Sequence, residues 1–85
     1  IDLSGRSAFK FKGKFPTDHV GEFPSEMCPH VFESLSQTLG ASIHITVNGE
    51  NTHHMIEACF KGVARALRPA FKRSGNEIAL TKGVI

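Results

Sequence analysis

The sequence contains no tryptophan and no tyrosine, and its charges nearly balance, with 10 Lys and Arg against 8 Asp and Glu. A nucleic-acid-binding domain usually carries a strong basic excess and exposed aromatic side chains that stack on bases. The sequence also lacks an apolar run near the ~20 residues that a membrane-spanning helix needs. We therefore expect neither a nucleic-acid partner nor insertion into a membrane.

Cysteine is scarce as well. Cys28 and Cys59 are the only two cysteines. They lack the dense spacing of a disulfide scaffold, which favours a reducing compartment such as the cytoplasm. The 85 residues, 40% of them hydrophobic, suffice for one small two-layer domain. Since the chain opens at Ile1 rather than at a methionine, we expect this single domain, residues 1–85, to be a fragment of a longer protein.

The first half of the chain predicts two strands and a helix. Apolar and basic residues alternate from Ser7 to Phe15, which is typical of a half-buried strand with a bulge or turn at Gly13. A short strand can follow at His19–Phe23. Beyond it, Ser25 is suited to cap a helix that Gly40 is placed to end. The apolar stripe of this helix consists of Val31, Phe32, Leu35 and Leu39.

The second half predicts one more strand and a long helix. Apolar residues occupy every second position of 43–47, which indicates a strand with one buried face. A helix capped by Asn51 or Thr52 can then extend to Leu67 or slightly beyond. Pro69 is expected to bend or end this helix, and the tail from Arg73 to Ile85 is expected to be mostly loop. The order of elements indicates an α+β two-layer sandwich in which two helices cover one face of a small sheet.

The long helix carries four polar side chains on one side. At about 100° per residue, His53, His54, Glu57 and Lys61 fall within one quadrant of the helix. Its apolar side is made of Met55, Ile56, Cys59, Phe60, Val63 and Leu67. We therefore expect the apolar side to pack on the sheet and the four polar residues to face solvent or a partner.

This quadrant has the composition of a metal site. Imidazole nitrogens and carboxylate oxygens are ligands for Mn, Fe, Co, Ni and Zn, and residues three or four apart on a helix can reach one ion. Because His53 and His54 differ by about 100° around the helix, both cannot easily share one ion with Glu57. Two ions, each completed from elsewhere, fit better, and the outward-facing His30 of the preceding helix is the natural additional ligand. The alternative is that all these histidines are ordinary surface residues. Lys61 stands close enough to the quadrant to bind an anion there.

Four pieces of the sequence, in this order, resemble the C-terminal half of imidazoleglycerol-phosphate dehydratase, a histidine-biosynthesis enzyme. They are IDLSGR at the start, EMCPHVFESL in the first helix, GENTHHMIEACFKGVARALR in the second and TKGVI at the end. The stretch NTHHMIEACFK is specific to the family, whereas the other pieces would be weak alone. Together the pieces span nearly all of the chain.

The resemblance implies one half of a duplicated, pseudo-symmetric fold of the ribosomal protein S5 domain 2-like type, in a homo-oligomer of twenty-four subunits. It implies a hydro-lyase that removes water from imidazole glycerol phosphate to give imidazole acetol phosphate, in the cytoplasm or in the plastid of a plant. The N-terminal half of the same enzyme is then a partner. That absent half is expected to carry the catalytic base, so the isolated chain is expected to be inactive.

The resemblance also implies a cofactor of two Mn²⁺ ions per active site. The ligands that it assigns to this half are His30, His53, His54 and Glu57. The residues that it assigns to the substrate phosphate are Arg6, Lys61, Thr81 and Lys82. The sequence departs from the family pattern at Ala79 and Leu80, which replace a proline and a serine and remove one hydroxyl from the phosphate clamp. Ser7 replaces a further proline and affects only a local turn.

The residues leave two other functions open. A half of this kind could bind metal and oligomerise without turning over substrate, as a non-catalytic assembly fragment. A hydrolase could use the same ligands to activate water. The second function is disfavoured because no additional Ser, Asp or Glu stands at a useful spacing from His53–Glu57.

Overall fold

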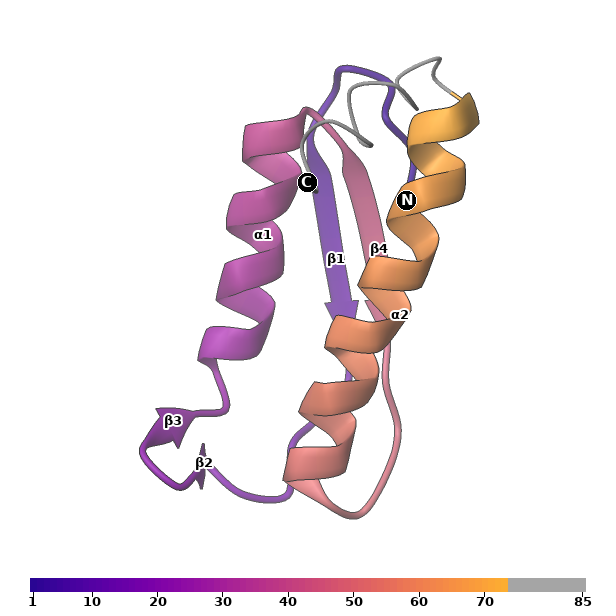
Figure 1. Cartoon of the computed structure of the whole chain (residues 1–85). Coiled ribbons are helices and arrows are strands. Elements are labelled where there is room, and N and C mark those ends of the chain that lie inside the picture. Colours follow the sequence, from indigo (N-terminus) through magenta and orange to yellow (C-terminus); the bar gives the residue numbers. More distant parts are fainter. Residues whose placement is uncertain (74–85) are drawn as a thin grey trace.

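The computed structural model describes residues 1–73. Its main sheet is a parallel pair of strands, β1 and β4, and both helices lie on the same side of that pair (Figure 1). This is the predicted α+β arrangement. The elements in chain order are β1 (Ala8–Lys12), β2 (His19–Val20), β3 (Phe23–Pro24), α1 (Met27–Leu39), β4 (Ser42–Thr46) and α2 (Thr52–Arg73).

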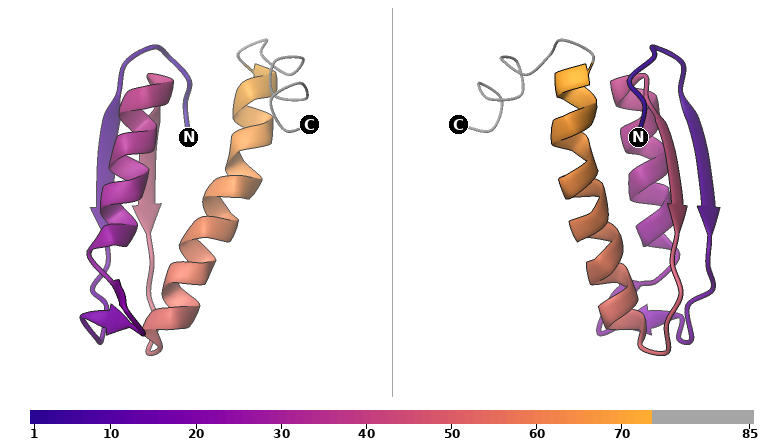
Figure 2. Two further views of the ribbon diagram at one scale, coloured as in Figure 1. Left: turned by 60° about the vertical axis from the view of Figure 1, so that its left-hand side comes forward. Right: turned by 90° about the vertical axis from the view of Figure 1, so that its right-hand side faces the viewer.

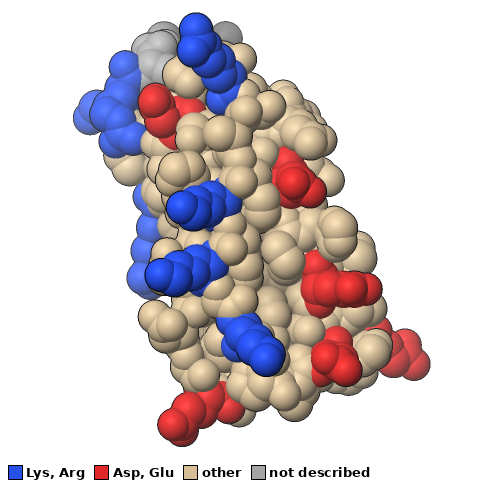
Figure 3. Space-filling view, turned by 180° about the vertical axis from the view of Figure 1, so that it is seen from behind, with Lys and Arg blue, Asp and Glu red and all other residues tan. Residues whose placement is uncertain are grey.

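The parallel pair forms because each strand has one apolar side. Phe9 and Phe11 of β1 lie in register with Ile43 and Ile45 of β4, and all four are buried or half-buried. The intervening residues are mostly exposed, as the alternation predicted. Figure 3 shows Lys and Arg side chains in a column on the side of the molecule opposite to that of Figure 1. The core therefore lies only on the helix side of the sheet.

β1 ends just before Gly13, where the sequence predicted an interruption. A Cβ atom at Gly13 would stand 2.7 Å from Val47 Cγ1 and 2.7 Å from the Val47 carbonyl oxygen. The Val47 N–H also donates to the Lys12 carbonyl at 2.9 Å, which holds the two segments together. Only a glycine fits this close approach without displacing the backbone.

Two predictions about the segment before α1 were wrong. The segment His19–Phe23 is not one strand, because the chain reverses at Gly21, whose φ of 61° is readily adopted by glycine, and β2 pairs antiparallel with β3. Ser25 is not the N-cap of α1. Glu26 holds that position without a side-chain capping bond, while Ser25 is buried and its N–H donates to the Asp18 carbonyl at 2.7 Å. The hairpin therefore draws Ser25 into the interior and away from the helix end.

The two helix ends were predicted with different success. Gly40 ends α1 in the left-handed conformation, with φ 62° and ψ 42°, as predicted. By contrast, α2 passes through Pro69 and continues to Arg73. Pro69 has no N–H to donate to the carbonyl of Arg65, one turn earlier in the helix. Both residues are exposed, so this carbonyl can bind water instead. Of the helices in residues 1–73, none combines the length and the apolar character that crossing a membrane requires.

The core joins the two helices to the sheet. The rings of Phe32 in α1 and Phe60 in α2 have centroids 4.8 Å apart. Figure 2 shows that α2 starts near the β2–β3 hairpin and diverges from the β1–β4 pair toward its C-terminal end. The N-terminal end of α2 is thus the end held closest to the rest of the chain. The buried cluster comprises Cys28, Phe32, Val47, Met55, Cys59 and Val63.

Candidate metal centre

Three of the four candidate ligands, His53, His54 and Glu57, stand in the first two turns of α2, which a side chain caps. Asn51 Oδ1 accepts a hydrogen bond from the His54 N–H at 2.9 Å, and the Asn51 carbonyl accepts one from the Met55 N–H at 3.0 Å. The sequence left Asn51 and Thr52 as alternatives for this cap, and Asn51 is the residue that makes the bond. The cap fixes where the helix begins and therefore the direction in which each later side chain points.

The predicted outward-facing quadrant is confirmed. His53, His54, Glu57 and Lys61 are all exposed. His53 Nε2 lies 3.4 Å from Glu57 Oε2, with the two side chains 63% and 48% exposed. Two ligand atoms on neighbouring corners of an octahedral ion with bonds of about 2.1 Å are roughly 3 Å apart. A nitrogen and an oxygen at this spacing, open to solvent, therefore fit a shared divalent ion.

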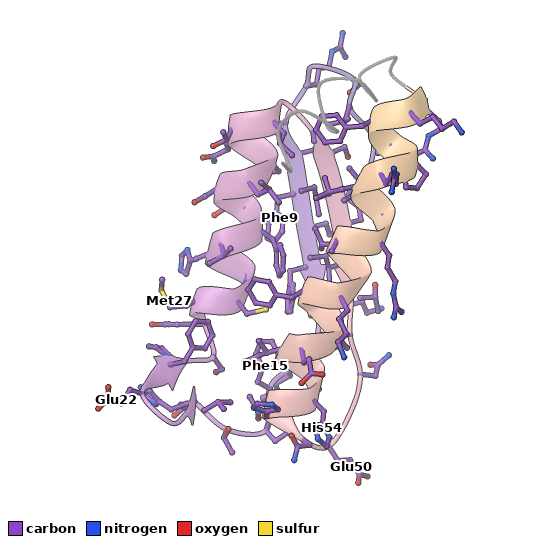
Figure 4. The ribbon with its side chains drawn as sticks, in the orientation of Figure 1. Phe9, Phe15, Glu22, Met27, Glu50 and His54 are labelled. Carbon is purple, nitrogen blue, oxygen red and sulfur yellow. The ribbon has the colours of Figure 1, made fainter. Side chains whose placement is uncertain are left out.

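His54 faces a different direction from this pair. The two imidazole rings have centroids 5.9 Å apart and are inclined at 75°. In Figure 4, His54 lies beside the loop that carries Glu50, at the start of α2. That His53 and His54 do not share one ion with Glu57 stays a prediction.

Lys61 forms an ion pair with Glu57 and lowers the pKa of its carboxyl. Lys61 Nζ donates a hydrogen bond of 2.7 Å to Glu57 Oε1. This bond, and then the positive charge of Lys61, lower the pKa of Glu57 below its ordinary value, and the nearby histidines add a smaller effect in the same direction. One carboxylate oxygen is thus held by Lys61, while the other lies beside His53. A ligand carboxylate must be deprotonated, and Lys61 extends the ionised form of Glu57 to lower pH.

The comparisons with known proteins identify the family. The sequence model of imidazoleglycerol-phosphate dehydratase matches residues 1–67. The chain belongs to this dehydratase family. Similar curated proteins include the histidine biosynthesis bifunctional protein HisB of Legionella pneumophila, 56% identical, that of Xanthomonas oryzae, 48% identical, and that of Stenotrophomonas maltophilia, 47% identical. Each match covers all 85 residues of this chain but only 24%, 23% and 24% of the respective relative, so the chain spans about a quarter of their length.

The described part of the chain does not assemble a complete set of ligands for one ion. His30 is exposed on α1, as predicted. Among residues 1–73, however, no group of three His, Cys, Asp or Glu side chains converges to hold one ion. His53 and Glu57 form the closest candidate pair within that range, and His30 and His54 offer single ligands. Any ion bound by these residues would need further ligands from another part of the protein or from another subunit.

The residues expected to bind phosphate are not brought together either. Arg6 follows Gly5, whose N–H donates to the Gly40 carbonyl at 3.0 Å, at the C-terminal end of α1. That end lies opposite the start of α2 (Figure 1). Lys61 is occupied by Glu57 on α2. Thr81 and Lys82 lie outside the described residues, as do the two family departures at Ala79 and Leu80.

Two features next to the ligands were missed by the sequence analysis. Thr17 hydrogen-bonds Thr52, the first residue of α2, across 35 positions of the chain. No local sequence pattern predicts such a contact. The second feature is a shallow, mainly apolar hollow beside the ligand pair, where the β2–β3 hairpin meets α2. Its lining residues are Val20, Phe23, His53, Ile56, Glu57 and Phe60.

The two cysteines lie in the core beneath this surface. Both are free and buried. Burial, and then the neighbouring Cys59 thiol, raise the pKa of Cys28 to about 12, and burial raises the pKa of Cys59. Neutral thiols in such a setting behave as small apolar side chains, as expected for Cys59 from its place on the apolar side of the helix.

Proposed function

We propose that this chain supplies part of the active site of a manganese-dependent hydro-lyase. The reaction is the removal of water from imidazole glycerol phosphate to give imidazole acetol phosphate, in histidine biosynthesis. Family membership supports the dehydratase class. The single observation that carries the metal dependence is the pair His53 Nε2 and Glu57 Oε2, 3.4 Å apart on an exposed helix face.

The residues divide into two sets of roles. His53 and Glu57 would hold one Mn²⁺ ion, whereas His54 and His30 would each contribute a ligand to an ion completed elsewhere. When bound, manganese supplies a Lewis acid for the imidazole nitrogens of the substrate. Lys61 pairs with Glu57 and stands where it can reach an anionic group of the substrate. The catalytic base is assigned to the N-terminal half of the enzyme, which makes the isolated chain inactive.

The phosphate clamp is proposed to form between subunits. The residues assigned to it are Arg6, Lys61, Thr81 and Lys82. Because Arg6 lies at the opposite end of the molecule from the start of α2, a site that uses Arg6 together with the α2 ligands would draw them from different copies. This supports a homo-oligomer, proposed to contain twenty-four subunits. The free thiols are in keeping with the cytoplasm as its compartment.

A mass-spectrometric assay of the full-length protein tests this function. The protein, freed of metal and reloaded with Mn²⁺, is incubated with imidazole glycerol phosphate, and we expect a product lighter by one water molecule. Glu57→Gln should abolish the product, whereas His44→Ala, at an exposed position of β4, should not. Turnover by the metal-free protein would contradict the metal dependence. Manganese binding without any product would instead favour a non-catalytic assembly fragment.

A further inference from the structure

Thr52 turns inward where its neighbours turn outward. It is the first residue of α2 and only 6% exposed, while His53 and His54, directly after it, are exposed. Its side chain therefore points away from the ligand face and into the protein. It does so at the end of α2 that lies closest to the β2–β3 hairpin (Figure 2).

Thr52 is joined to Thr17 by two hydrogen bonds. Thr52 Oγ1 accepts the Thr17 N–H at 3.0 Å, and the two hydroxyl oxygens are 2.9 Å apart. Thr17 Oγ1 is also 2.9 Å from the His19 carbonyl, to which it donates. The Thr17 hydroxyl thus stands within donating distance of two acceptors, the His19 carbonyl and Thr52 Oγ1. Every polar group of this arrangement thus has a partner.

This contact holds a part of the helix that would otherwise be weakly fixed. The first N–H groups of a helix have no intrahelical acceptor, so the first turn opens easily unless something holds it. The Asn51 cap satisfies the His54 N–H but stays within the helix end itself. The bonds from Thr17, which precedes β2, instead connect the first turn to another part of the fold.

We propose that Thr17 and Thr52 are positioning residues for the ligands at the start of α2. The pair of hydroxyls fixes the first turn, and through the backbone it fixes the directions of His53 and His54. Neither hydroxyl needs to touch metal or substrate. The proposal rests on the proposed function, because it takes these histidines as ligands. Metal ligands need placement within about 0.5 Å, and groups that orient them typically change metal affinity by about 10- to 100-fold.

The test uses variants of the full-length protein that separate the hydroxyl from the shape of the side chain. Thr52→Val keeps the branched shape without the hydroxyl, Thr52→Ser keeps the hydroxyl, and Thr46→Val is the matched control at an exposed position of β4. Affinity is measured by titrating Mn²⁺ and following the electron paramagnetic resonance signal of the free ion. Hydrogen exchange at the Met55 amide, measured without metal, reports on the first turn directly.

We expect Thr52→Val to bind Mn²⁺ about 10- to 100-fold more weakly and to exchange faster at Met55. Thr52→Ser and Thr46→Val should stay close to the wild type. If Thr52→Val and Thr46→Val give the same Mn²⁺ affinity and the same exchange rate at Met55, the positioning role is refuted. The proposed metal site would not be affected by that result. If Thr52→Val does not fold, Thr17→Val takes its place, because it alters an exposed residue and should weaken Mn²⁺ binding in the same way. Wild-type Mn²⁺ affinity and wild-type Met55 exchange in Thr17→Val would then overturn the proposal. A wild-type protein that binds no Mn²⁺ would refute the proposed function and this proposal with it.

Discussion

Lys61 Nζ lies 2.7 Å from Glu57 Oε1, one helical turn further along α2. The contact brings a residue expected to bind phosphate against a residue expected to bind metal. Both side chains are largely exposed, so the pair contributes little to folding. Its consequence is electrostatic: it lowers the pKa of a candidate ligand.

Replacing Lys61 by methionine should raise the pKa of Glu57 toward its ordinary value, because the hydrogen bond and the positive charge are both removed. The folded-state pKa of Glu57 is depressed, so its small contribution to stability is present above the unfolded-state pKa and is lost as pH falls through the folded-state value. Carboxyl NMR titration of metal-free protein measures the shift. An unchanged titration curve would mean that Lys61 does not control Glu57.

His53→Ala, His54→Ala and Glu57→Gln should each weaken Mn²⁺ binding by at least about tenfold, because each removes a proposed ligand. Since all three residues are exposed, helix content measured by circular dichroism should hardly change. His44→Ala serves as the control histidine. Equal Mn²⁺ affinity in all three variants and the wild type would leave the histidines as ordinary surface residues.

Lys61→Ala in the full-length protein should mainly weaken the binding of inorganic phosphate, since a charge-assisted contact is worth about 1.5–3 kcal/mol. Isothermal titration calorimetry with phosphate and with Mn²⁺ separates the two effects. Arg65→Ala, an exposed substitution one turn further along α2, is the control. Loss of Mn²⁺ binding with intact phosphate affinity would assign Lys61 to the metal site instead.

Gly13→Ala should destabilise the fold by about 1–3 kcal/mol, because the new Cβ atom would meet Val47 at 2.7 Å. Gly62→Ala is the matched substitution at a helix position with no atom within 4 Å of the new Cβ, and it should stabilise by about 0.5–1 kcal/mol. Urea denaturation measures both. Similar effects at the two glycines would contradict the close contact of Gly13 with Val47.

The elements that sequence predicted well depend on local periodicity. Met55, Cys59 and Val63 recur at helical spacing, and all three are buried. The exposure of the opposite, ligand-bearing side of α2 could therefore be predicted from the spacing alone. The end of α1 at Gly40 could be predicted because glycine is the residue that most readily adopts the left-handed conformation of a helix C-terminus.

What could not be predicted depends on contacts between distant segments. Ser25 has the chemistry of an N-cap, but the β2–β3 hairpin buries it. Thr17 and Thr52 have no common pattern, and their hydrogen bonds exist only because the fold brings a loop to the start of α2. The place of His30 on α1 relative to the α2 ligands likewise depends on how the two helices pack in the fold. Periodicity within one helix contains no information about that.

We expect the ligand face of α2 to bind manganese together with ligands from outside this chain. A metal that binds only the assembled site stabilises the assembly by mass action. Light scattering of the full-length protein, before and after EDTA and again after Mn²⁺ is restored, measures this most directly. We expect the mass to fall on chelation and to recover with Mn²⁺, and the recovery to fail for Glu57→Gln. A mass and a melting temperature that stay the same throughout would contradict the claim.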